Sequence, residues 1–99
     1  MRVISEKTLR TFWERYPTAE KPLQAWLAEV KRAQWASPAQ VKTRFPNASI
    51  IRDNRLVFDI GGTRFRLVVW INYTHQAIYV KWFGTHAEYD RIDVERVEP

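Results

Sequence analysis

Cysteine is absent from the 99-residue chain, and so are long apolar runs. The lack of cysteine excludes a disulfide scaffold, a thiol nucleophile and any cysteine-ligated metal or iron–sulfur site. The longest apolar run, Leu67–Ile71, has five residues, whereas a membrane-spanning helix needs about 20. No apolar stretch follows the N-terminus, so we expect no signal peptide, no membrane partner and a cytoplasmic protein.

The motifs of several enzyme classes are missing too. The two histidines occur without an acidic ligand pattern, which argues against a zinc site. Gly61-Gly62 lacks the Lys-Ser/Thr of a phosphate-binding loop, and there is no serine nucleophile motif. Paired acids suited to two metals are also absent from the basic strands. We therefore expect neither a bound metal nor a cofactor.

What the chain has in excess is positive charge, with 16 Lys and Arg against 11 Asp and Glu, a net charge of +5. This charge is unevenly placed. Residues 1–86 contain fourteen bases and six acids (+8), whereas residues 87–99 contain two bases and five acids (−3). A basic body of this size indicates an anionic partner, with nucleic acid the first choice. The alternative is ordinary charge that keeps a surface soluble.

The length fits one domain over residues 1–99, with helices in the first half. Apolar residues recur at i, i+3, i+4 and i+7 in two segments, which predicts helices over residues 5–16 and about 20–33. Ser37-Pro38 begins a third, short helix, and residues 1–4 form a candidate strand.

From residue 48 onward apolar residues alternate with polar ones, which predicts strands joined by turns at 53–54, 61–62 and 73–76. A two-residue loop at 61–62 places Asp59 opposite Arg64, and a four-residue loop at 73–76 places Ile71 opposite Ile78. The turn at 53–54 places Ile51 opposite Leu56. These registers keep the apolar residues on one face. The predicted fold is α+β: N-terminal helices packed on one face of an antiparallel β-meander, with a short C-terminal helix.

The other face of the predicted meander interleaves basic and aromatic residues, a combination suited to single-stranded nucleic acid. Arg52 and Arg55 lie opposite each other, which is unfavourable unless an anion relieves them. Arg64 has two interpretations, an RNA contact or a pair with Asp59. Within the same register Arg66 has no acidic neighbour. The residues predicted on this face are Arg52, Arg55, Val57, Asp59, Arg64, Arg66, Val68, Trp70, Tyr79, Lys81 and Phe83, and the RNA-binding candidates among them are Arg52, Arg55, Arg64, Trp70 and Tyr79.

A second cluster follows the last strand. Thr85 and Glu88 form a predicted capping box, which places His86 and Tyr89 on the first turn of a short helix. One interpretation is a catalytic pair beside the basic face. The other is a histidine and a tyrosine that only pack a terminal helix.

One reaction fits a basic surface with these side chains and no metal. RNA is cleaved when its own 2′-OH attacks the neighbouring phosphate, which requires a base, an acid and cations for the developing charge. We expect His86 or Tyr89 to transfer protons and Arg66 and Lys81 to stabilise the transition state; base and acid are not distinguished.

Four stretches carry a family resemblance: Met1–Ser5, Phe58–Gly62, Phe65–Leu67 and Gly84–Asp90. They resemble the HigB-type toxins of bacterial toxin–antitoxin pairs, over nearly the whole chain. The resemblance implies one RelE-like domain and a ribosome-associated endoribonuclease, an mRNA interferase, that cuts translated mRNA at the A site and so inhibits translation. It also implies a cognate HigA-type helix-turn-helix antitoxin.

Catalytic residues differ among RelE-like toxins, so the resemblance implies roles only for Arg66, Lys81, His86 and Tyr89. Asp59 departs from the asparagine expected in many such sequences, which favours the Asp59–Arg64 pair over an RNA role for Arg64.

Two alternatives use the same face without chemistry. A non-catalytic RNA-binding module predicts salt-sensitive binding with the RNA left intact. A protein-interaction module predicts a stable complex with which RNA does not compete. The acidic residues after Tyr89 either shield the basic face or form a solvated terminus, and the second is the expectation.

Overall fold

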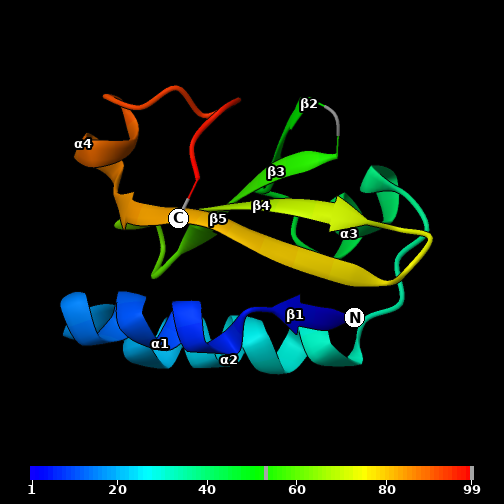
Figure 1. The fold of residues 1–99 in the computed structure, drawn as a ribbon, viewed down its shortest axis with the longest axis horizontal. Helices are drawn as coiled ribbons and strands as arrows, with labels where there is room; N and C mark the ends of the chain where they lie inside the picture. The colour runs from blue at the N-terminus through cyan, green and yellow to red at the C-terminus, as the bar shows by residue number, and fades with distance from the viewer. Residues whose placement is uncertain (53, 99) are drawn as a thin grey trace.

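The computed structural model describes residues 1–52 and 54–98. A helical layer covers one face of a five-stranded sheet of order β1-β5-β4-β3-β2, and α4 and the C-terminal residues lie on the other side (Figure 1). Strands β2–β5 form the predicted antiparallel meander, and β1 adds a parallel edge beside β5. The predicted α+β fold is thus confirmed, with a mixed sheet. The helices are α1 (Glu6–Arg15), η1 (Pro17–Ala19), α2 (Glu20–Arg32), α3 (Pro38–Arg44) and α4 (His86–Tyr89), and the strands are β1 (Arg2–Ile4), β2 (Ser49–Arg52), β3 (Arg55–Ile60), β4 (Phe65–Asn72) and β5 (Ala77–Thr85).

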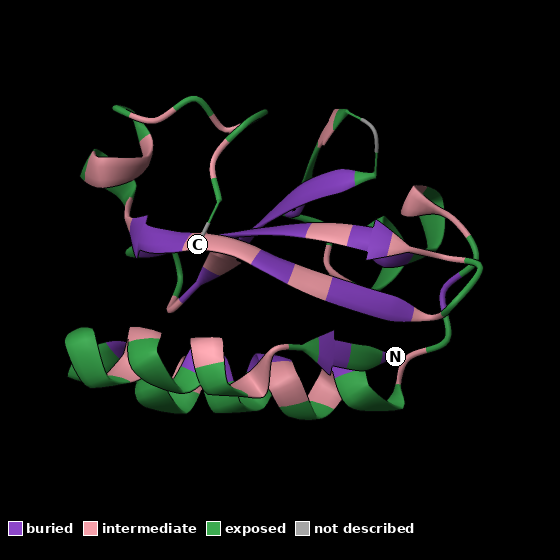
Figure 2. Cartoon of the chain, viewed as in Figure 1, coloured by how far each residue is buried: buried purple, intermediate pink, exposed green. Residues whose placement is uncertain are grey.

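The helices form where the apolar spacing predicts them. The side chain of Ser5 caps α1 by accepting a hydrogen bond from the Thr8 amide at 3.0 Å. One stripe of α2 is buried, and its Trp26 ring meets the Phe58 ring of β3 at 5.4 Å between centroids. Figure 2 shows the consequence: the strands are largely buried, whereas the outer sides of α1 and α2 are exposed. No helix in the described part of the chain is long and apolar enough to cross a membrane.

The hairpin between β3 and β4 departs from the predicted register. Gly61 and Gly62 both have positive φ, as expected, but the loop includes two further residues, and Ile60 pairs with Phe65. A change of two residues keeps every side chain on its predicted face and changes its partner. Asp59 therefore lies opposite Arg66, and the predicted Asp59–Arg64 pair is wrong. Arg64 is exposed in the turn.

A bulge in the β4–β5 pairing causes a second departure. Ile71 pairs with Ile78 as predicted, but the register shifts between Val68 and Val69. Beyond this shift the two faces of β5 exchange. Phe83, predicted on the uncovered face, is instead in the core, and Trp82 takes the uncovered face opposite Val68.

The β2–β3 hairpin is irregular as well. Arg52 lies opposite Arg55, as predicted. The register shifts between Ile50 and Arg52, so Ile50 rather than Ile51 lies opposite Leu56. The predicted turn here includes Asp53, which lies outside the described residues.

Candidate active site

Arg66 is the centre of a cluster on the uncovered face of the sheet, at the end where β5 leads into α4. Its Nε lies 3.0 Å from an Asp59 carboxylate oxygen on β3. Its guanidinium carbon lies 5.2 Å from the centroid of the Tyr89 ring on α4. Contrary to the prediction, Arg66 therefore has an acidic neighbour. Among the described residues, no other group pairs with its guanidinium, so the terminal nitrogens are available to an anion.

Two aromatic rings extend this cluster. The rings of Trp82 and Tyr89 lie 6.2 Å apart with an interplanar angle of 55°. Trp82 lies so close over Gly84 that a Cβ at position 84 would be 2.5 Å from the indole ring. Burial raises the pKa of the Tyr89 hydroxyl, and the charge of Arg66 partly opposes this shift. The phenol is consequently protonated near neutral pH.

The short helix α4 is fixed by Glu88. The predicted capping box is confirmed: the Thr85 hydroxyl accepts from the Glu88 amide, and the Glu88 carboxylate accepts from the Thr85 amide at 2.8 Å. The same carboxylate oxygen accepts from the Tyr16 hydroxyl at 2.7 Å, which ties α4 to the end of α1. The Thr85 amide and the Tyr16 hydroxyl hold the pKa of Glu88 below its ordinary value. α4 is therefore fixed from two directions.

His86 opens α4 and is half exposed. Its backbone N–H donates to the Arg64 carbonyl at 3.0 Å, which joins α4 to the turn before β4. Its Nδ1 lies 3.5 Å from an Asp90 carboxylate oxygen. The imidazole thus has one nitrogen beside an acid, which orients the ring. This backbone contact places Arg64, a predicted RNA-binding residue, beside His86.

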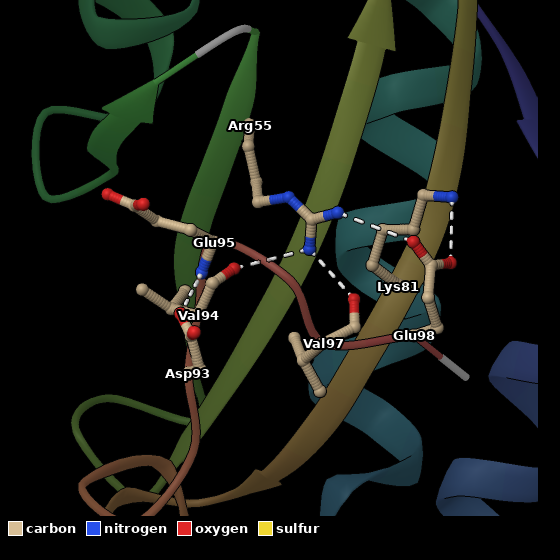
Figure 3. Close-up of polar contacts among 7 residues, drawn as sticks. All are labelled: Arg55, Lys81, Asp93, Val94, Glu95, Val97 and Glu98. Carbon is tan, nitrogen blue, oxygen red and sulfur yellow. Dashed lines mark hydrogen bonds and ion pairs between the residues drawn. The ribbon is translucent and has the colours of Figure 1, made fainter.

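Lys81 lies elsewhere, under residues 93–98, which we call the C-terminal segment (Figure 3). Its Nζ pairs with Glu98 at 3.0 Å, and this hydrogen bond holds the pKa of Glu98 below its ordinary value. Within the described residues, no hydrogen bond or ion pair links Lys81 to Arg66, His86 or Tyr89. Arg66 and Tyr89 are thus in contact, His86 lies on the same short helix as Tyr89, and Lys81 pairs instead with the C-terminal segment.

The C-terminal segment also contacts two predicted RNA-binding residues: it covers Arg55, whose side chain is 10% exposed, and it pairs with Arg52, whose side chain stays 62% exposed. Arg55 donates to the backbone carbonyls of Val94 at 3.2 Å and Val97 at 2.8 Å (Figure 3). Arg52 pairs with Glu95 at 3.1 Å. The expectation of a solvated terminus is therefore wrong. The bonds that hold the segment in place, two of them to backbone carbonyls, are not visible in a sequence.

The remaining predicted RNA-binding residues are aromatic. Trp70 and Tyr79 pair across β4 and β5 with ring centroids 5.6 Å apart, and both are partly exposed. Trp70 also lies opposite Arg55 on β3. The uncovered face thus has two ends. The open end comprises Asp59, Arg66, Trp82, His86 and Tyr89, and the covered end comprises Arg52, Arg55, Trp70, Tyr79 and Lys81.

Sequence reasoning missed several residues of the open end. The Asp59–Arg66 pair was missed because the turn length was wrong by two residues. Trp82 was missed because Trp82 and Phe83 are both aromatic, so the alternation of residue types does not show that a bulge exchanges the faces on which they lie. Outside the open end, Tyr16 was missed as the anchor of α4, because its partner Glu88 is 72 residues away and gives no local signal. In the described part of the chain, no group of three or more His, Cys, Asp or Glu residues is arranged to hold a metal ion.

Comparison with known proteins identifies the family to which the chain belongs. Residues 19–92 match the family model of the HigB toxin, described as the RelE-like toxic component of a toxin–antitoxin system. The chain is 29% identical over 94 residues to the mRNA interferase HigB of Escherichia coli O6:H1 (strain CFT073), which covers 93% of this chain and 91% of that protein. It is also 29% identical over 92 residues to the mRNA interferase toxin HigB of Escherichia coli (strain K12), covering 91% and 88%. The mRNA interferase HigB of Shigella flexneri matches to the same extent.

Proposed function

Because the chain belongs to the HigB family of RelE-like toxins, we propose that it is an endoribonuclease that cuts messenger RNA at the open end. The observation that carries the proposal is Arg66, which pairs with Asp59 and lies over the Tyr89 ring, and whose terminal nitrogens make no hydrogen bond or ion pair within the described residues. A fixed guanidinium stabilises the charge that develops on a phosphate during cleavage. The names of the relatives, mRNA interferases, support the substrate.

The cleavage uses the RNA's own 2′-OH. The 2′-oxygen forms a bond to phosphorus while the bond from phosphorus to the 5′-oxygen breaks, which leaves a 2′,3′-cyclic phosphate and a 5′-hydroxyl. One proton leaves the 2′-OH and one reaches the 5′-oxygen, so neither water nor metal is consumed. We assign proton donation to Tyr89, whose raised pKa keeps the phenol protonated. His86, half exposed beside Asp90, then accepts the 2′-OH proton.

The aromatic residues of the face bind the bases. Trp82 lies beside Tyr89 at the open end, and Trp70 lies beside Tyr79 at the covered end. Rings of this kind stack on unpaired bases of any sequence. An RNA strand that lies along the face therefore places its phosphates against the arginines and its bases against the aromatic rings. Single-stranded stretches of translated mRNA can bind in this way.

The partners follow from this proposal. The substrate is mRNA on the ribosome, and the toxin reaches it by entering the A site. The protein acts in the cytoplasm, because translated mRNA is found there. A HigA-type helix-turn-helix antitoxin neutralises the toxin. The family description, a toxic component of a toxin–antitoxin system, supports an antitoxin partner.

A paired expression experiment tests the proposal. The protein is induced in bacteria, and 5′ ends are mapped on two copies of one message, one of which has no start codon. We expect new ends in the translated copy alone, and their loss in His86→Ala. His75→Ala is the matched control, because His75 is exposed in the turn between β4 and β5. Cuts in both copies would indicate a ribosome-independent nuclease, and growth arrest with intact RNA would contradict catalysis and favour the binding module.

A further inference from the structure

The C-terminal segment lies on the same side of the sheet as α4, yet within the described residues it adds no strand to the sheet (Figure 1). It contains three acids and one base, residues 93–98 being Asp-Val-Glu-Arg-Val-Glu. Within the segment, the backbone forms a turn in which the Asp93 carbonyl accepts a hydrogen bond from the Val97 amide at 3.0 Å. The segment is thus an acidic turn placed on a basic surface.

We propose that the C-terminal segment is an intramolecular competitor for RNA, whose glutamates occupy the cations that otherwise bind RNA phosphates beside the active site. The inference rests on the proposed function and extends it. It assigns Lys81, Arg52 and Arg55 to phosphate binding rather than to chemistry, and it adds a segment that RNA must displace.

The covered end concentrates positive charge. Arg52 and Arg55 lie opposite each other on adjacent strands, and like charges in that position repel. The segment relieves them with Glu95 on Arg52 and Glu98 near Arg55 at 3.5 Å. A phosphate oxygen accepts the same charge-assisted hydrogen bonds as these carboxylates. A strand of RNA can therefore replace the segment without leaving the arginines unpaired.

The contacts between the C-terminal segment and the sheet are exchangeable. The side chains of Glu95 and Glu98 remain 44% and 58% exposed, and ion pairs with exposed partners are weak and screened by salt. The tether nonetheless keeps the segment at a high effective concentration. It therefore competes with RNA without blocking the face permanently.

Neutralising the two glutamates tests the competition. The probe is a 2′-O-methyl oligoribonucleotide without terminal phosphates, which its own 2′-oxygens cannot cleave. We expect Glu95→Gln/Glu98→Gln to bind this probe about tenfold more tightly than wild type at low salt. Glu14→Gln/Glu20→Gln is the control, because it makes the same change in net charge on exposed positions of α1 and α2. An equal gain in the control would overturn the proposal.

Carbodiimide coupling tests the displacement itself. This reagent joins an ion-paired lysine and carboxylate into an amide, and peptide mass spectrometry identifies the product. We expect Lys81–Glu98, 3.0 Å apart, to couple in the free protein and the probe RNA to suppress that product. Lys31–Glu6, an ion pair of 3.2 Å in the helical layer, is the internal control and continues to couple.

The outcomes separate the two proposals. Tight RNA binding with undiminished Lys81–Glu98 coupling would overturn the competitor and leave the proposed function standing. The same holds if the double glutamine variant binds RNA no better than wild type. If neither protein binds the probe and neither cleaves mRNA on ribosomes, both proposals fail.

Discussion

The open and covered ends of the sheet face hold their arginines in different ways. Arg66 pairs with Asp59 of the adjacent strand, and its side chain remains 20% exposed. Arg55 is bonded to backbone carbonyls 39 and 42 residues away, in the C-terminal segment, and its side chain is only 10% exposed. One arginine is positioned by the sheet itself, and the other is covered by a segment outside the sheet.

The difference shows how one pattern of alternating arginines serves two purposes. The partner of Arg66 belongs to the adjacent strand of the sheet, so the β3–β4 pairing keeps the two side chains beside each other and the guanidinium is in place when a phosphate arrives. Electrostatic preorganisation of this kind is usually the largest single contribution to catalysis. The partners of Arg55 can leave while the sheet remains intact, which suits binding and regulation.

The largest expected effect comes from replacing Arg66 at the open end. Arg66→Ala should slow cleavage on message-programmed ribosomes by about 100-fold or more, because it removes the cation at the phosphate. Arg66→Lys should recover only part of this rate, since an ammonium lacks the planar fork. The urea-unfolding free energy should change little. Arg10→Ala, an exposed arginine of α1, is the control for net charge; an equal loss there would refute the assignment.

Gly84→Ala sharpens the role of the aromatic pair. The added Cβ would be 2.5 Å from the Trp82 ring and 2.9 Å from a Glu88 carboxylate oxygen, so the indole beside Tyr89 and the anchor of α4 must both shift. We expect a loss of about 2 kcal/mol in the free energy of unfolding together with slower cleavage. Gly62→Ala is the matched control, because nothing lies within 4 Å of its Cβ and only its positive φ of 70° opposes the substitution. It should lose stability without slower cleavage.

Arg55→Ala breaks the covered end. The two carbonyls that it binds lose their charged donor and the segment is released, so the free energy of unfolding should fall by about 1 kcal/mol. Hydrogen exchange at the Val97 amide should accelerate, because its turn loses support. Arg66→Ala should leave this amide unchanged. Equal exchange in the two variants would remove the distinction between the ends.

The smallest effect concerns pH at the anchor of α4. The pKa of Glu88 is lowered by the Thr85 amide and the Tyr16 hydroxyl, so the ionised carboxylate stabilises the folded state above the ordinary carboxyl range. This contribution disappears as the pH falls through the lowered pKa. The stability difference between pH 7 and roughly pH 3 should therefore be smaller in Glu88→Gln than in wild type. Glu14→Gln, exposed on α1, should keep the full difference.

The elements of the fold could be predicted because their signals are local. Helical spacing, the Ser5, Ser37 and Thr85 caps and alternation located α1 to α4 and the strands of the meander, but not the short helix η1. The predicted faces of the β3 and β4 residues were correct although the predicted loop at Gly61-Gly62 was too short. The observed loop is longer by two residues, and a shift by an even number keeps each side chain on the same face. The shift at Val68/Val69 does not preserve parity, and it moved Phe83 into the core.

The candidate site was predicted less well because its partners depend on register and on distant contacts. Arg66, His86 and Tyr89 were identified by residue type, yet the acid that holds Arg66 followed only from the observed pairing. Lys81 was assigned to the site because it shares a face with Arg66. Its actual partner, Glu98, depends on where the chain turns after α4, which no periodic pattern records.

The most direct test of the account is the chemistry of the cut RNA. Message cleaved on ribosomes by the wild-type protein would be digested to short fragments, and mass spectrometry would identify the 3′ end at the cleavage site. We expect a 2′,3′-cyclic phosphate or its 3′-phosphate hydrolysis product, and no cleavage when the nucleotide before the cut carries a 2′-deoxy substitution. A 3′-hydroxyl end, or unchanged cleavage of the 2′-deoxy message, would contradict it.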